Sequence, residues 1–343
     1  MLNKGLLKID MRSTSMVLGI LAVLFFLQYP LRALLELDWL RTVAEEPSYN
    51  QQMFNSQYGY FIEDLFGASV FSVFVIAAVL IIAGMLIGLE RNTRRHDFNL
   101  SLPFSRKEIF LTKATLGVGM ITLLFWLNVA LALIIIQFSE FSQTLSQLNV
   151  LEMMIVPWLS LLAIYMFTLF MGTISGEMIS QIVLSIIFLV FPYGFTMLVG
   201  IALTVHMGNV GRVWIGMDEF ILAFTIPFHL FNVYHAFDHM AILYIMVSLA
   251  MFVLSLVLGT FLYGKGKSEK NGEFLLFQPL QPVFLIGIVA CFGMFGGTIF
   301  TVFIVSTGAA ILFYWFGFLV VGGIAFLITR RLLQMNVTLK TNR

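Results

Sequence analysis

The chain has 343 residues, of which 60% are hydrophobic and only 11% are charged, and its formal net charge at pH 7 is +1. The mean hydropathy of +0.97 and the low charged fraction exclude an ordinary soluble domain and predict a protein of the lipid bilayer. No basic face or aromatic–basic groove indicates a nucleic-acid partner. The single cysteine, Cys291, excludes an intramolecular disulfide and a metal site built on paired thiolates.

Eight apolar runs follow one another along the chain, each long enough to cross about 30 Å of hydrocarbon as a helix. We therefore predict an all-α fold, a polytopic membrane helical bundle with about eight transmembrane helices in a single domain over residues 1–343. Because one helix over the last two runs would overshoot a bilayer, we expect a tight hairpin there. The runs cover approximately 16–35, 66–89, 114–138, 153–174, 181–205, 240–263, 283–303 and 307–329.

The basic residues predict the orientation of this bundle, because cytoplasmic loops are enriched in lysine and arginine. With both termini in the cytoplasm, 16 of the 19 basic residues lie on the cytoplasmic side, and only three lie outside. The cytoplasmic connections are then a segment at 89–113 and a second loop at 264–280. The longer external loops cover 36–65 and 206–239.

The charged residues all fall in loops or near the ends of the apolar runs. Carriers driven by protons or sodium usually place an ionisable side chain inside the membrane, so the sequence favours a passive channel, a scaffold, or a transporter whose energy comes from another chain. Residues 259–265 match the GxxxxGK pattern of a P-loop, but Gly266 replaces the magnesium-binding serine or threonine. These residues also lie at the end of a predicted membrane helix, whereas a P-loop follows a β-strand. If ATP is the energy source, ATP and Mg²⁺ are therefore expected on a partner chain, and no cofactor is expected on this one.

The segment at 89–113 combines six basic residues with interleaved apolar residues. An amphipathic segment of this kind can lie in the membrane interface and offer polar groups to a peripheral protein. Pro103 is expected to end its first part, and Ser105 is placed to cap a short helix that begins near Arg106 with Glu108 in the first turn. The predicted object is a kinked, amphipathic, cytoplasmic elbow.

The order of residues in this segment resembles that of a known family. Glu90, the run SLPFSRKEI at 101–109, and Lys113 are similar to the E … SLPxSRxEI … K segment of bacterial permeases of the ABC-2 (type V, exporter-like) group. In that family the segment forms the coupling helix that docks on the ATPase subunit. A second stretch, 263–274, resembles the Y-x-R-x-S-E-x-x-G segment of eight-span permeases of the Ytr type.

The resemblance implies a non-catalytic permease subunit of an ATP-driven ABC transporter in the bacterial cytoplasmic membrane. Such a subunit would work with two ATPase subunits and with a second copy of itself or a similar permease, and would export a hydrophobic or amphipathic compound. The candidate coupling residues are Glu90, Leu102, Pro103, Phe104, Ser105, Arg106, Lys107, Glu108, Ile109 and Lys113, and a second partner contact is expected at Ser268, Glu269 and Gly272.

Individual roles follow from the chemistry of these side chains. Arg106 and Lys107 are expected to meet acidic groups of the partner or lipid headgroups. Glu90 is expected to order the elbow by pairing with a nearby basic residue. The apolar contact with the partner is expected from Leu102, Phe104 and Ile109.

Other interpretations stay open. The positive-inside rule alone gathers basic residues in any short cytoplasmic loop, so 89–113 and 264–280 could be solvated connectors of an ATP-independent channel or scaffold. An ABC-type assembly could also serve sensing or signalling without net transport. An intramembrane enzyme would need clustered polar catalytic residues at membrane depth, and none is found, so no catalytic residue is predicted.

The external stretch before the sixth run contains three histidines. His235 and His239 have the i, i+4 spacing that lets two imidazoles share a metal ion. Aromatic-rich interfacial segments also carry histidine for hydrogen bonding. We expect this hydrogen-bonding role for His229, His235 and His239, so no metal site is predicted. Residues 213–237 are expected to form a surface helix or a re-entrant element that closes the outer mouth.

Two glycine clusters lie inside apolar runs. One consists of Gly117 and Gly119, and the other of Gly293, Gly296 and Gly297. Small residues let helix backbones approach one another closely in a membrane. We therefore expect close helix contacts at both clusters.

Overall fold

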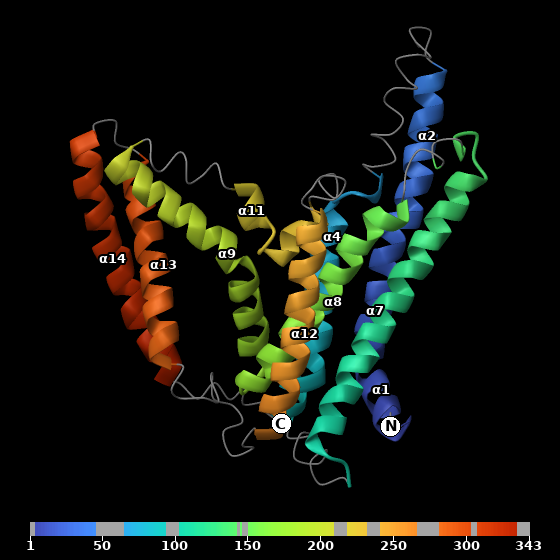
Figure 1. The fold of residues 1–343 in the computed structure, drawn as a ribbon, viewed down its shortest axis with the longest axis horizontal. Coiled ribbons are helices and arrows are strands. Elements are labelled where there is room, and N and C mark those ends of the chain that lie inside the picture. The colour runs from blue at the N-terminus through green and yellow to red at the C-terminus, as the bar shows by residue number, and fades with distance from the viewer. Residues whose placement is uncertain are drawn as a thin grey trace, which may run out of the picture. The chain divides into compact units, whose positions relative to one another are not determined.

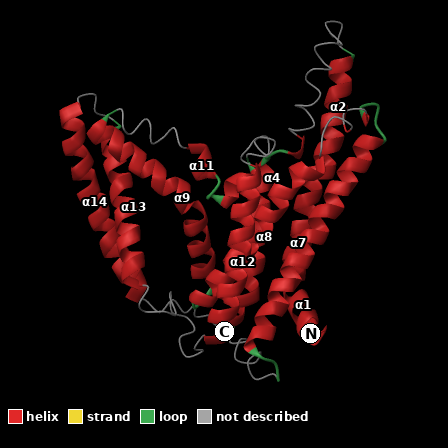
Figure 2. Ribbon diagram, viewed as in Figure 1, coloured by secondary structure: helices red, strands yellow, loops and turns green. Residues whose placement is uncertain are grey.

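A computed structural model of the chain describes residues 4–45, 65–93, 103–142, 145, 150–208, 218–231, 241–265, 281–302 and 307–334. Within these ranges all regular secondary structure is helical (Figure 2). Eight stretches of the described residues are long and apolar enough to cross a membrane. The predicted all-α fold with eight candidate transmembrane helices is therefore confirmed.

The first two candidate spans each consist of several helical segments. The first joins α1 (Lys4–Phe26), the π-helical turn η1 (Leu27–Leu31) and α2 (Arg32–Ala44), and the second joins α4 (Val70–Gly84), η2 (Met85–Leu89) and α5 (Glu90–Asn92). The other six are single helices, and two short elements, α11 (Asp218–Leu222) and η4 (Ile226–Leu230), lie between the fifth and sixth. The six helices are α7 (Arg106–Gln137), α8 (Val150–Ile174), α9 (Met178–Met207), α12 (Ala241–Lys265), α13 (Gln281–Thr301) and α14 (Thr307–Gln334).

Two helices are longer than the sequence predicted. The first runs without interruption from Lys4 to Ala44, and η1 within it contains Pro30, whose missing N–H loosens the helical hydrogen-bond ladder without ending the helix. The expected short elbow helix is wrong as a separate element, because α7 continues from Arg106 through the third span. Lys113 can lie inside the long helix α7 because its charge is paired with that of Asp10.

The chain forms two compact units, and each is described by itself. The first contains Met1–Leu86, Leu102–Phe170 and Ile226–Gly264. In this unit α1 packs against α7 (Figure 1) and against α4, and the aromatic core of the unit is built around Phe125. The Phe125 ring lies edge-on to Phe25 and to Tyr29, at centroid distances of 5.7 and 5.6 Å.

The second unit contains Ile87–Ser101, Met171–Thr225 and Lys265–Arg343. Its helices α13 and α14 lie side by side as a hairpin (Figure 1), which confirms the predicted break in the last apolar stretch. The glycine cluster at 293–297 makes this approach possible, because a Cβ added at Gly296 would lie 2.5 Å from the carbonyl oxygen of Gly317. Helix α9 packs against both helices of the hairpin.

Candidate functional site

The start of α7 is held by a reciprocal cap. The Ser105 hydroxyl accepts a hydrogen bond from the Glu108 backbone N–H at 3.3 Å, and a Glu108 carboxylate oxygen accepts one from the Ser105 backbone N–H at 2.8 Å. This capping box pairs N–H groups that the first turn of a helix leaves free. The predicted cap at Ser105, with Glu108 in the first turn, is confirmed.

Around this cap lies a polar surface, which we call the α7 N-terminal surface. Pro103, Ser105, Lys107 and Glu108 are exposed, and Phe104 and Arg106 are half-buried. These six residues were all predicted to contribute to coupling, and the structure brings them together on one turn and its approach. Of the other predicted coupling residues, Leu102 lies outside the described residues.

Ile109 requires a correction. Its side chain is only 1% exposed, so it cannot provide the predicted apolar contact with a partner. The reason is helical periodicity, which turns the residues after the cap inward: Phe110, next to it, is fully buried, whereas Leu111 is exposed again. Ile109 instead belongs to the buried side of α7.

The buried side of this first turn packs against the end of α12. The Phe110 and Tyr263 rings lie 5.6 Å apart, and Gly259 leaves room for the Phe110 ring, since an added Cβ would lie 2.5 Å from its Cζ. Arg106 Nη1 lies 3.5 Å from the Gly264 carbonyl oxygen. The structure therefore places the beginning of the predicted second cytoplasmic loop beside the α7 N-terminal surface, although Ser268, Glu269 and Gly272 lie outside the described residues.

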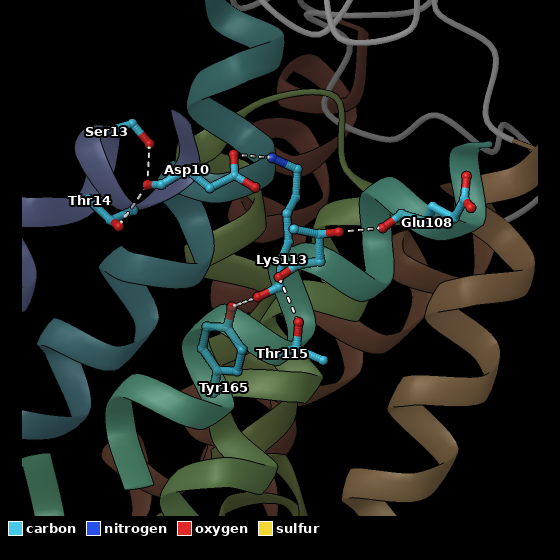
Figure 3. Close-up of polar contacts among 8 residues, drawn as sticks. Asp10, Ser13, Thr14, Glu108, Lys113, Thr115 and Tyr165 are labelled. Atoms are coloured by element: carbon cyan, nitrogen blue, oxygen red, sulfur yellow. Dashed lines mark hydrogen bonds and ion pairs between the residues drawn. The ribbon is translucent and has the colours of Figure 1, made fainter. Parts of the chain in front are cut away.

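Lys113 also differs from the prediction, since it lies inside the helix bundle of the first unit instead of on a docking surface. Figure 3 shows its side chain extending from α7 to Asp10 on α1, with Nζ 3.0 Å from Asp10 Oδ1. Both side chains are buried. From α8, the Tyr165 hydroxyl donates a hydrogen bond of 2.7 Å to the Lys113 carbonyl oxygen. Sequence reasoning missed Asp10, because residues 103 positions apart carry no local pattern.

The other end of the predicted elbow lies in the second unit. Arg91 is buried, and its Nη1 donates hydrogen bonds to the carbonyl oxygens of Gly172, at 2.7 Å, and Ser175. A cation at this place donates to carbonyl oxygens that the end of α8 leaves without a helical partner, and it offsets the partial negative charge of the carboxyl-terminal end of this helix. The predicted coupling residue Glu90 is buried as well, so it does not present a surface to a partner, and its expected pairing with a basic residue stays a prediction.

Glu177 lies between α8 and α9, outside the candidate spans, and is buried. Burial raises the pKa of its carboxyl group. The folded state therefore binds this proton more tightly than the unfolded state, and its stability falls as pH rises from the ordinary pKa through the raised one. Glu177→Gln is expected to shift the unfolding midpoint upward at pH 7.5, with a smaller gain at pH 4.5.

The measurement is the unfolding of the detergent-solubilised wild type and variant at both pH values, monitored by circular dichroism. The exposed Glu45→Gln provides a control that removes a carboxylate without changing a buried site. A variant that is less stable than wild type at pH 7.5 would contradict the expected sign.

His229 forms a separate polar cluster in the first unit. Its Nδ1 lies 3.0 Å from the Ser160 hydroxyl on α8 and 3.1 Å from the Ser248 hydroxyl on α12, and its ring stacks on Tyr244 at 4.6 Å. The expected hydrogen-bonding role of His229 is confirmed, and the short element η4 that carries it is buried. The surface helix or re-entrant element expected over 213–237 stays a prediction, because the structure describes only 218–231 of this range. No group of three or more potential ligands to a metal ion occurs among the described residues, from which His235 and His239 are missing.

Two known proteins are similar to this chain over most of its length. The probable ABC transporter permease YtrD of Bacillus subtilis (strain 168) is 27% identical over 244 residues, which make up 69% of this chain and 73% of the relative. The probable ABC transporter permease YtrC of the same organism is 24% identical over 228 residues, or 63% of this chain and 68% of the relative. The chain resembles Ytr-type permeases. No protein-family model and no solved structure matches it.

These findings confirm the predicted resemblance to Ytr-type ABC transporter permeases, whereas membership of the ABC-2 group stays a prediction. The eight apolar helices agree with a multi-pass membrane protein. Both relatives are permeases, which supports the interpretation of this chain as a permease subunit. Of the predicted coupling site, the structure describes the capped α7 N-terminal surface and the buried residues that follow it on α7.

Proposed function

We propose that this protein is the membrane-spanning permease subunit of an ATP-driven ABC transporter, and that a separate ATPase docks on the α7 N-terminal surface. The observation that carries the proposal is the construction of α7. A capped, polar first turn with Arg106 and Lys107 continues without a break into a helix long and apolar enough to span a membrane. The resemblance to YtrD and YtrC supports the same assignment.

The proposed assembly follows from the distribution of charge and from the resemblance. The positive-inside rule puts both termini and the α7 N-terminal surface in the cytoplasm of a bacterial cell, where ATP is available. Two ATPase subunits bind ATP and Mg²⁺, and this chain pairs with a second copy or a similar permease. Its own residues position the docking surface and form the path through the membrane, and they perform no catalysis.

Coupling requires that ATP favour one of two conformations of the assembly. Nucleotide shifts the equilibrium only as far as its affinities for the two conformations differ. A rigid α7 fits this requirement, because a displacement of its first turn is carried along the helix into the membrane. The proposed cargo is a hydrophobic or amphipathic compound, and the direction, export, follows the exporter-like family that the sequence resembles.

The test is co-purification of the tagged protein from its native membrane in mild detergent. Wild type is compared with Arg106→Glu/Lys107→Glu, and the captured chains are identified by mass spectrometry and assayed for ATPase activity. Reversing both charges is expected to abolish capture of a P-loop ATPase, because like charges across an interface repel. The matched control is Arg330→Glu/Arg331→Glu, an exposed basic pair on α14 with the same change in charge.

Two outcomes would contradict the proposal in different ways. If wild type is folded and captures no ATPase, an ATP-independent channel or scaffold becomes the better interpretation. If the ATPase remains bound to Arg106→Glu/Lys107→Glu, the docking surface lies elsewhere on the chain. Equal loss in both double variants would indicate a general effect of charge on insertion instead of docking.

A further inference from the structure

Lys113 lies about two helical turns after the start of α7, roughly 10 Å along its axis at 1.5 Å per residue. The helix between Arg106 and Lys113 is regular, and the Thr112 hydroxyl donates a hydrogen bond of 2.8 Å to the Glu108 carbonyl oxygen. A displacement of the α7 N-terminal surface therefore reaches Lys113 as a rigid movement.

At Lys113, α7 is attached to two other helices by chemically different interactions. The Lys113 ammonium group contacts Asp10 on α1, and the Lys113 main-chain carbonyl accepts the hydrogen bond from Tyr165 on α8. Figure 3 shows the two attachments on opposite sides of the same residue. Because one uses the side chain and the other the backbone, a substitution of Lys113 removes the first and leaves the second.

The burial of the ion pair makes a purely stabilising role a poor explanation. Removing two charges from water is costly, and well-packed apolar residues of similar volume often stabilise a protein as well as a buried pair does. A charge-assisted hydrogen bond, however, fixes the distance and direction between two atoms more strictly than apolar contact. This is the property required of a link between moving helices.

We propose that the Asp10–Lys113 pair transmits nucleotide-driven movement from the α7 N-terminal surface to α1. Both are then positioning residues of the transport cycle, with no contact to cargo or nucleotide. The inference rests on the proposed function, because it takes the docked ATPase as the source of the movement. Tyr165 carries the same movement to α8 by a route that does not depend on the charges.

The test uses the full chain with its co-purified ATPase, and compares wild type with Asp10→Leu/Lys113→Met. Hydrogen–deuterium exchange is measured by mass spectrometry with and without Mg²⁺ and the non-hydrolysable analogue AMP-PNP. In wild type, nucleotide is expected to change exchange in three places: the start of α7 at 103–113, the part of α8 around Tyr165, and the start of α1 at 4–16. In the double variant the changes in α7 and α8 persist, and the change in α1 is lost.

A swapped pair, Asp10→Lys/Lys113→Asp, is the rescue variant and is expected to restore the response of α1. If α1 responds to nucleotide as strongly in Asp10→Leu/Lys113→Met as in wild type, the inference is overturned while the proposed function stands. The same holds if wild-type α1 is silent although α7 responds. If wild type captures no ATPase, or shows no nucleotide response at 103–113, the proposed function fails and the inference fails with it.

Discussion

Replacing Lys113 with methionine is expected to lower the free energy of unfolding by about 3–5 kcal/mol, because the carboxylate of Asp10 stays buried and loses the ammonium group 3.0 Å away. Methionine fills a similar volume, so the loss reflects charge more than packing. The measurement is a titration of the detergent-solubilised protein with sodium dodecyl sulfate, followed by circular dichroism.

Two comparison variants isolate the contribution of charge. Lys107→Met removes an exposed ammonium group from the same helix and is expected to change stability by no more than about 0.5 kcal/mol. Asp10→Leu/Lys113→Met removes both buried charges and is expected to recover most of the loss. If Lys113→Met were as stable as Lys107→Met, the ion pair would contribute little to the fold.

Gly117→Ala is expected to destabilise the first unit by about 1–3 kcal/mol through overpacking. A Cβ added at this position would lie 2.5 Å from Cε1 of the Tyr165 ring and closer still to its Cζ. The ring is fully buried and its hydroxyl is bonded to the Lys113 carbonyl oxygen, so it cannot move aside without breaking that bond. We therefore expect α7 and α8 to separate locally.

Tryptophan fluorescence gives a direct measurement of that separation, because the ring centroids of Trp126 on α7 and Trp158 on α8 lie 6.0 Å apart. The control is Gly119→Ala, two residues along the same helix, where an added Cβ would meet no atom of the described residues within 4 Å. That change is expected to be neutral or slightly stabilising, since alanine is the better helix former. Equal stability and fluorescence in the two variants would show that the close contact at Gly117 is not required.

Several features of the fold could be predicted because their causes are local in the sequence. A membrane span needs only about 20 consecutive apolar residues, and all eight predicted runs correspond to helices. The cap at Ser105 depends on a residue three positions away, Glu108. The break in the last apolar stretch follows from length alone, since no bilayer accommodates one helix over both runs.

The residues of α7 that are buried after its cap were harder to predict, because the side of a membrane helix that faces the protein is not marked by polarity. In water, a buried helix face is apolar and an exposed face is polar, but in a bilayer both faces are apolar. Ile109 and Leu111 are similar in character, yet the tertiary structure buries Ile109 and leaves Leu111 exposed, while Phe110 between them packs against Tyr263 of α12. The same reason separates Gly117, which lies against Tyr165, from Gly119, where no other described residue comes within 4 Å of an added Cβ.

The amino-acid sequence by itself therefore determined that the described part of the chain contains eight helices long and apolar enough to span a membrane, where the capped start of α7 lies, and which protein family the chain resembles. The tertiary structure decided what the charged residues near that start do. The sequence shows Arg91 and Lys113 as two of six basic residues in one segment, whereas the structure buries Arg91 against the end of α8 and Lys113 against Asp10. The physical reason is that the partner of a buried charge is selected by three-dimensional proximity, across any separation in sequence, and no local pattern records it.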